Sequence, residues 1–186
     1  MLSRILKEHT KTPHQELESA IIYKIKQLGS TQSYINFLKV FYGYLAAVEE
    51  KISASIDTGV IEDYAERRKG DKLLDDISIL SVPSGSIPLA QNTPEITNNA
   101  QALGAMYVLE GSTLGGKYIS RMISQQLQLP PEDGFSFFNG YREQTDTMWE
   151  KFKTQLDNHS SINTEGSVIE AANQTFIKFK IWIDEH

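Results

Sequence analysis

Cysteine is absent from this 186-residue sequence, and only four histidines are present. Without cysteine the chain can form no disulfide, no thiolate metal site and no cysteine nucleophile, which suits a reducing compartment and predicts a cytoplasmic protein. A hydrolase triad is hard to build because the sequence has no Gly-x-Ser-x-Gly elbow. The histidines do not supply the paired Glu-x-x-His motifs of a di-iron helical bundle. These absences exclude several common classes of catalytic site.

Long apolar runs and an excess of basic charge are also missing. No run approaches the length of a membrane span, and the polar stretch Lys7–His14 lies where a signal peptide would be apolar. Lysine and arginine number 18 against 24 aspartates and glutamates, and the net charge of −6 argues against nucleic acid as the main partner. With 40% hydrophobic and 23% charged residues, the chain is expected to form one globular domain, 1–186, with no membrane partner.

Helical spacing of apolar residues dominates the sequence, and no stretch alternates convincingly as a strand would. We therefore predict an all-α fold of six or seven helices. The clearest amphipathic stripe starts at Tyr34, and its apolar positions are Phe37, Leu38, Phe41, Tyr42, Leu45, Val48 and Ile52. Aromatic residues at this spacing favour a core helix over a cofactor site. Further helices are expected over 61–80, 98–127, 148–156 and 167–183, with a proline-rich loop over 82–94.

Two predicted helix starts rest on capping patterns. Ser167 and Glu170 have the spacing of a capping box at the start of the last helix. Near the N-terminus, Pro13 interrupts the helical pattern. Thr12 and Gln15 flank it with the spacing of another capping box, which predicts that a second helix begins there. The alternative is one kinked helix.

The segment Ala105–Ser120 has a helical pattern that is interrupted by Gly111, Gly115 and Gly116. Three glycines in a helix interior cost about 3 kcal/mol relative to alanine, a sizeable share of the roughly 5–15 kcal/mol that stabilises a domain. Gly111 and Gly115 are four residues apart and lie on one helix face. Their missing Cβ atoms allow the helix to bend or a flat body to approach the backbone. That body is either another helix or a ligand.

His14 is the histidine with the most informative neighbours. On a continuous helix, Lys7, Lys11 and His14 fall on one face, whereas His9 lies roughly 140° from His14. One imidazole and two ammonium groups suit a planar iron macrocycle that carries carboxylate side arms. The alternative interpretation is a surface helix with scattered charge.

Two segments together resemble the biliverdin-producing heme oxygenases, in the form common in bacteria. Lys7–Glu18, which reads KEHTKTPHQELE, resembles the proximal helix of that family, with His14 at the position of the axial iron ligand. Tyr107–Gly116, which reads YVLEGSTLGG, resembles the distal helix. Phe138–Phe152 and Val168–Phe176 are similar to the closing helices, so the resemblance covers nearly the whole chain.

The resemblance implies an all-α, single-domain fold in which heme lies between a proximal helix and a kinked distal helix. His14 is implied as the only metal ligand. The implied heme-binding residues are Lys7, Thr10, Lys11, His14, Lys151, Lys153, Phe176 and Phe179. Lys7 and Lys11 would lie toward the propionates, and Lys151 or Lys153 would add charge from the other side. Thr10 would lie beside the ring, and the phenylalanines would wall the apolar end. The implied catalytic residues of the distal helix are Gly111, Ser112, Gly115 and Gly116.

The activity implied by the resemblance is oxidative cleavage of heme to biliverdin, iron and carbon monoxide. Heme is then both substrate and cofactor, dioxygen is consumed, and electrons come from a separate reductase or ferredoxin. One alternative is a heme-binding or carrier protein of the same fold, and another is a relative that binds a different small molecule. Ser112 stands where mammalian-type enzymes carry an aspartate that organises water near the distal helix. We hypothesise that Ser112, Thr113 and backbone groups hold a water network there instead.

Three polar features near these motifs have less specific interpretations. The basic run Arg67, Arg68 and Lys69 is expected to be a solvated face, with docking of an acidic electron donor as the alternative. Glu110 is interpreted as structural, through a bond to a neighbouring helix. His159 and His186 are expected to be solvated.

Overall fold

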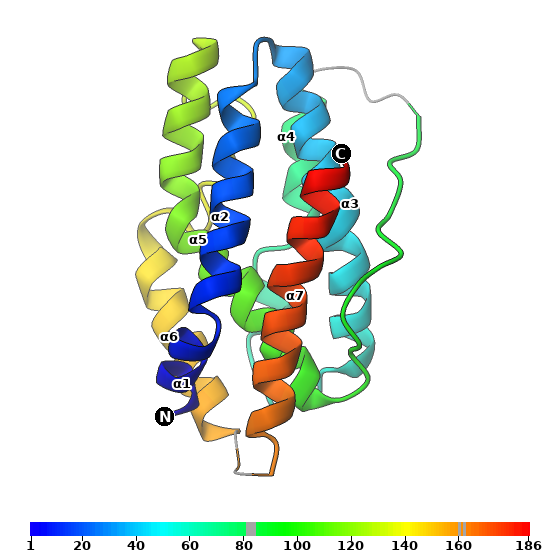
Figure 1. Ribbon diagram of the computed structural model, residues 1–186. Helices are drawn as coiled ribbons and strands as arrows, with labels where there is room; N and C mark the ends of the chain where they lie inside the picture. Colours follow the sequence, from blue (N-terminus) through cyan, green and yellow to red (C-terminus); the bar gives the residue numbers. More distant parts are fainter. Residues whose placement is uncertain (81–84, 160, 162) are drawn as a thin grey trace.

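Helices form all the regular secondary structure in the described part of the chain (Figure 1). The computed structural model describes residues 1–80, 85–159, 161 and 163–186. Within these ranges the α-helices are α1 (Leu2–His9), α2 (Lys11–Lys26), α3 (Thr31–Ser55), α4 (Asp71–Leu80), α5 (Asn99–Leu127), α6 (Thr145–Asn158) and α7 (Glu165–Glu185). Two short 3-10 helices are η1 (Tyr64–Glu66) and η2 (Arg142–Gln144). The all-α prediction is confirmed. No helix in the described ranges is both long and apolar enough to cross a membrane.

The last helix, α7, lies at the front between α2 and α3 in the view of Figure 1, and it packs against α5, α2, α3 and α1. Its closest approach to α5 is at Gly104, where an added Cβ would collide with the Val168 carbonyl oxygen and lie 2.9 Å from the Ala171 Cβ. The backbones of the two helices can touch there only because Gly104 has no side chain. The first turns of α5 are therefore fixed against α7.

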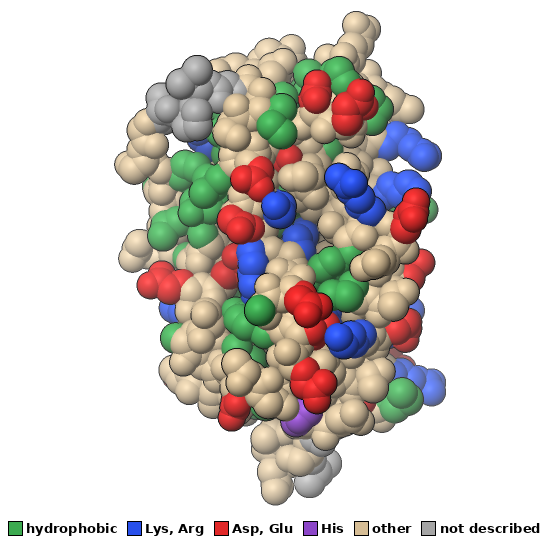
Figure 2. All heavy atoms as spheres, turned by 180° about the vertical axis from the view of Figure 1, so that it is seen from behind, with side chains coloured by type: hydrophobic (Ala, Val, Ile, Leu, Met, Phe, Trp, Pro, Cys, Tyr) green, Lys and Arg blue, Asp and Glu red, His purple; other side chains and the backbone are tan. Residues whose placement is uncertain are grey.

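Aromatic side chains fill the core between α3 and α7. Tyr34, Phe37, Phe41 and Tyr44 of α3 are all buried, which confirms that this stripe forms core. Phe179 of α7 stacks on Tyr44 at 4.4 Å and meets Phe41 edge-on at 5.1 Å between ring centroids. On the face seen in Figure 2, which is the back of the molecule in Figure 1, acidic and basic side chains are interspersed.

A break at Thr10 separates α1 from α2. Thr10 has φ −99° and ψ 2°, and α2 begins at Lys11 with no side-chain cap. A second helix therefore begins near the predicted place, but the predicted capping box at Thr12 and Gln15 is wrong. Pro13 lies in the first turn of α2, where backbone N–H groups have no partner within the helix, so the missing N–H costs no hydrogen bond there.

Two other predicted boundaries are wrong. Residues 61–80 do not form one helix, because α4 begins only at Asp71 and Gly70 donates its N–H to both Glu49 carboxylate oxygens, at 3.0 and 2.9 Å. The last helix begins at Glu165 rather than at Ser167, so the predicted capping box lies inside it. The predicted loop over 82–94 has no helix or strand over 85–94, and its residues 82–84 lie outside the described ranges.

Candidate functional site

Helices α2 and α5 both pack against α7, yet they have no extensive packing against each other. They are linked at two places. Near one end the Tyr107 side chain hydrogen-bonds with Thr10, just before α2. At the other end Gln126 Nε2 donates to the Leu28 carbonyl oxygen at 2.5 Å. We call the region between α2 and α5 that is bounded by these two links the α2–α5 interval.

The glycines of α5 face different surroundings. A Cβ added at Gly115 would meet nothing within 4 Å, and one at Gly111 would meet only the Trp149 ring, at 3.6 Å. A Cβ at Gly116 would instead collide with the Phe138 carbonyl oxygen. The glycine at 116 therefore permits packing of the turn around Phe138 against α5. Gly111 and Gly115 leave the backbone accessible, as close approach of a flat ligand requires.

His14 lies in the first turn of α2, and its side chain is exposed. The imidazole meets the ring of Phe176 on α7 edge-on, with 5.4 Å between centroids. Phe176 is buried, so one side of the imidazole rests on the core while the rest stays accessible. An exposed histidine held on one side in this way is available to a metal or ligand.

The four predicted lysines are not equivalent. Lys7 and Lys11 are exposed, but they lie on different helices, so the shared face expected of one continuous helix does not extend to Lys7. Lys153 lies 5.7 Å from the Trp149 ring centroid and pairs with Glu150 at 2.8 Å. It is therefore next to the residue that covers Gly111. Lys151 instead pairs with the buried carboxylate of Asp63 at 3.0 Å.

The remaining predicted residues are buried or hydrogen-bonded within the protein. Thr10 is buried and donates its hydroxyl to the Leu6 carbonyl oxygen at 2.7 Å. Phe179 packs in the core with Tyr44, whereas Phe176 contacts His14. The structure thus places Phe176 against His14 and Phe179 in the core beside Tyr44.

The hydroxyl groups of Ser112 and Thr113, which follow Gly111 in the chain, already form hydrogen bonds within the protein. Ser112 donates to the Leu109 carbonyl oxygen at 2.6 Å and accepts from Arg68 Nη2 at 2.9 Å. Thr113 is buried and donates to the Glu110 carbonyl oxygen at 2.6 Å. Each proton is therefore committed to the helix backbone, which leaves Ser112 able to act only as an acceptor toward a distal water.

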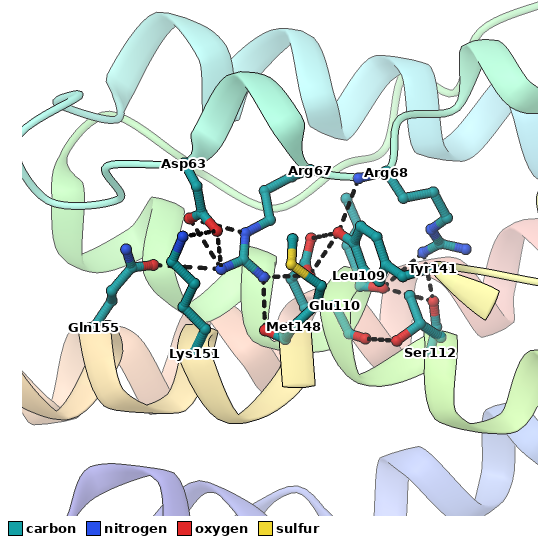
Figure 3. Close-up of polar contacts among 11 residues, drawn as sticks. Asp63, Arg67, Arg68, Leu109, Glu110, Ser112, Tyr141, Met148, Lys151 and Gln155 are labelled. Carbon is teal, nitrogen blue, oxygen red and sulfur yellow. Dashed lines mark hydrogen bonds and ion pairs between the residues drawn. The ribbon is translucent and has the colours of Figure 1, made fainter. Parts of the chain in front are cut away.

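A buried polar network lies behind the glycine segment, and sequence reasoning missed it (Figure 3). Arg67 Nη1 donates to Glu110 Oε2 at 2.9 Å, and Arg67 Nη2 lies 2.9 Å from Asp63 Oδ2. The exposed fractions of the Arg67, Glu110 and Asp63 side chains are 1%, 5% and 3%. The prediction that Arg67–Lys69 is a solvated face is therefore wrong. The signal that could have located the network is the four-residue spacing of Asp63 and Arg67, with Glu110 inside an apolar helix.

Charge pairing outweighs burial in this network. Burial disfavours the charged form of Arg67, but Glu110 and Asp63 together raise its pKa above the ordinary value. Burial also acts against the charge of Asp63, yet hydrogen bonds from Lys151 and Arg67 hold the pKa of that carboxyl below its usual range. Both groups are therefore charged at neutral pH.

Comparisons of the sequence and of the fold with known proteins identify the family of this chain. The sequence profile of the heme oxygenase family, described as "Heme oxygenase", matches residues 1–185. A heme oxygenase from Xanthomonas campestris pv. campestris is 28% identical over 79% of this chain and 86% of its own length. The heme oxygenase structure from Leptospira interrogans has a TM-score of 0.79 at 20% identity and covers 100% of this chain and 99% of that chain. The NO- and CO-bound heme oxygenase from Neisseria meningitidis has a TM-score of 0.77 at 20% identity and covers 100% and 91%. Because the profile match extends over almost the whole chain, the protein belongs to the heme oxygenase family and is a heme oxygenase, with heme as its substrate.

Proposed function

We propose that heme binds in the α2–α5 interval, with the His14 imidazole as the axial iron ligand and the face of Gly111 and Gly115 across the ring. The observations that support this assignment are the open space at Gly115 on α5 and the exposed side chain of His14 on α2. The bound heme supplies the iron at which dioxygen is reduced, and the products are biliverdin, iron and carbon monoxide. Phe176 restricts rotation of the imidazole by edge contact.

Cationic side chains at the margins of this site are proposed to hold the heme propionates. Lys11 is exposed in the same first turn of α2 as His14, Lys7 is exposed on α1, and Lys153 is next to Trp149, which covers Gly111. Lysine ammonium groups attract carboxylates without fixing their geometry. Lys151 is committed to Asp63, so a contribution to propionate binding would compete with that ion pair.

Electrons are proposed to come from a separate reductase or ferredoxin in the cytoplasm. The sequence contains no Gly-x-Gly-x-x-Gly fingerprint after a strand, and helices form the regular secondary structure over the described ranges. The absence of cysteine suits a reducing compartment. Gly111 and Gly115 would leave room for dioxygen on the distal side, while Gly116 permits the turn around Phe138 to pack against α5.

Hemin added to the purified protein tests this assignment directly. We expect a shifted Soret band that saturates at one hemin per chain. Addition of a reductase with NADPH should then produce biliverdin absorbance. An unchanged hemin spectrum would refute the heme site, whereas saturable binding without product from several donors would favour the carrier alternative.

Gly115→Leu is expected to obstruct the distal side of the site. Its side chain would occupy the open space above the helix, so hemin affinity should fall about tenfold and the composition of biliverdin isomers should change. The matched control is Gly166→Leu, because Gly166 is also helical and a Cβ there meets nothing within 4 Å. Hemin titration and chromatography of the product isomers measure both effects. Parental affinity with parental isomers in Gly115→Leu would place the substrate elsewhere.

A further inference from the structure

Three side chains from outside α5 hold one turn of that helix, Leu109–Ser112, which we call the anchored turn (Figure 3). Arg67 Nη1 donates to Glu110 Oε2 at 2.9 Å. The Tyr141 hydroxyl donates to the same carboxylate, at 2.9 Å from Oε2, and accepts from the Arg68 backbone N–H at 2.8 Å. Arg68 Nη2 donates to the Leu109 carbonyl oxygen at 2.7 Å and to Ser112 Oγ at 2.9 Å. The anchored turn contains Gly111 and ends three residues before Gly115.

The hydrogen bonds of the anchored turn favour a bend in α5. The Leu109 and Glu110 carbonyl oxygens accept from the hydroxyls of Ser112 and Thr113, at 2.6 Å each, and Leu109 also accepts from Arg68. Carbonyl groups that take extra donors tilt away from the helix axis, and a glycine at this place offers little resistance. In Figure 1 the axis of α5 changes direction near its middle.

Arg68 is not placed to maximise stability. Its Nε is buried and has no hydrogen-bond partner within the described residues, and a buried unsatisfied donor costs about 1–3 kcal/mol. Burial also lowers the pKa of its guanidinium from the ordinary value. The group lies 4.0 Å from the Phe137 ring centroid, which fixes its plane between the 135–141 turn and α5. What this arrangement provides is a defined position for the Leu109 carbonyl group.

We propose that Arg68 and Tyr141 are positioning residues that fix the anchored turn and so determine which meso carbon of heme is attacked. The inference rests on the proposed heme site. Glycines have no side chains with which to hold their own backbone, so the distance of Gly111 and Gly115 from the heme plane depends on these external tethers. Displacement of a reacting geometry by about 1 Å can change a rate by about 100-fold, so small shifts of this turn alter the preferred carbon.

Hydrogen exchange in the heme-free protein tests the tether without substrate. Arg68→Met keeps an unbranched stem but removes every side-chain donor, while the backbone N–H that donates to Tyr141 remains. We expect the amides of residues 110–116 to exchange about tenfold faster than in the parent, with α3 and α7 unchanged. The control is Lys72→Met, which removes an exposed ion pair with Asp75 on α4. Parental exchange rates in a folded Arg68→Met protein would overturn the tether.

The hemin complexes test the consequence for the reaction. Arg68→Met should bind hemin within about threefold of the parent, because it does not line the proposed site, but should give a mixture of biliverdin isomers. The pH midpoint at which water on ferric heme deprotonates should also shift by about 0.5 unit, since that water faces the displaced turn. Tyr141→Phe, which loses only one hydroxyl, should shift both readouts in the same direction and serves if Arg68→Met does not fold.

The possible outcomes separate the two proposals. Unchanged isomers and an unchanged pH midpoint in folded Arg68→Met or Tyr141→Phe would refute the positioning role while leaving the heme site intact. Failure of the parent itself to bind hemin or to form biliverdin would refute the heme site and the positioning role together. Faster exchange over 110–116 combined with mixed isomers would support both.

Discussion

Replacing His14 by alanine is expected to remove the axial nitrogen ligand and nearly abolish biliverdin formation. The imidazole is exposed, lies in the first turn of α2 and rests on Phe176, so its loss should leave the fold intact. Loss of residues that merely support a metal ligand costs about 10–100-fold, so loss of the ligand itself should lower turnover by at least about 100-fold. The absorption and electron paramagnetic resonance spectra of the ferric complex measure the ligand, and biliverdin formation measures turnover.

Two controls make the His14 result specific. His9→Ala removes another exposed histidine, on α1, and should retain the parental spectrum. Imidazole added to His14→Ala should restore the nitrogen-ligand spectrum, because a free imidazole can occupy the space left by the side chain. A parental spectrum in His14→Ala without added imidazole would show that another residue ligates the iron.

Arg67→Met is expected to cause the largest loss of stability among the single substitutions considered. It leaves the Glu110 and Asp63 carboxylates, 5% and 3% exposed, without their shared cation. Removing one partner of a buried ion pair costs about 3–5 kcal/mol. This is a large share of the roughly 5–15 kcal/mol that stabilises a typical domain. Urea unfolding followed by far-ultraviolet circular dichroism measures the change.

Comparison with a surface ion pair and with a double variant tests this explanation. Lys72→Met should change the free energy of unfolding by less than about 1 kcal/mol, because the Lys72–Asp75 pair is exposed. Arg67→Met combined with Glu110→Leu should be less destabilised than the sum of the single variants. A loss of only about 1 kcal/mol in Arg67→Met would mean that water or a rearranged Lys151 compensates the carboxylates.

The stability difference between the parent and Arg67→Met depends on pH in a direction that follows from the pKa of Asp63. The pKa of the Asp63 carboxyl is lower in the folded protein than its ordinary value. Its contribution to stability is therefore present above the unfolded pKa of about 3.9 and is lost as the pH falls through the folded pKa. The stability difference between the parent and Arg67→Met should accordingly shrink below about pH 4.

The two helices of the proposed site are easier to predict from the sequence than the residues that support them. The motifs around His14 and Gly111 are local, so their helical periodicity and residue types could be read directly. The partnership of Arg67 with Glu110 joins residues far apart in the sequence, and consecutive cations usually indicate a solvated surface. Only the folded structure, in which Arg67 pairs with Glu110 of α5, shows that Arg67 is buried.

Neighbouring residues of the same type also had different roles that the sequence could not separate. Gly115 and Gly116 look equivalent in the motif, but successive helix positions point about 100° apart. One faces open space and the other faces the Phe138 carbonyl oxygen. Helix starts were misplaced at Thr12 and Ser167 because capping patterns occur inside helices as well as at their ends.

The close packing at Gly104 and Gly116 determines which wall of the site can move. At Gly104 α5 packs directly on α7, and at Gly116 it packs on the backbone of Phe138, so we expect α5 to move little when heme enters the proposed site or a bilin leaves it. On the opposite side, the chain leaves helical geometry at Thr10, where α1 ends and α2 begins. We expect passage of substrate and product to depend on hinge motion of α1 and of the first turn of α2, which contains the proposed iron ligand His14.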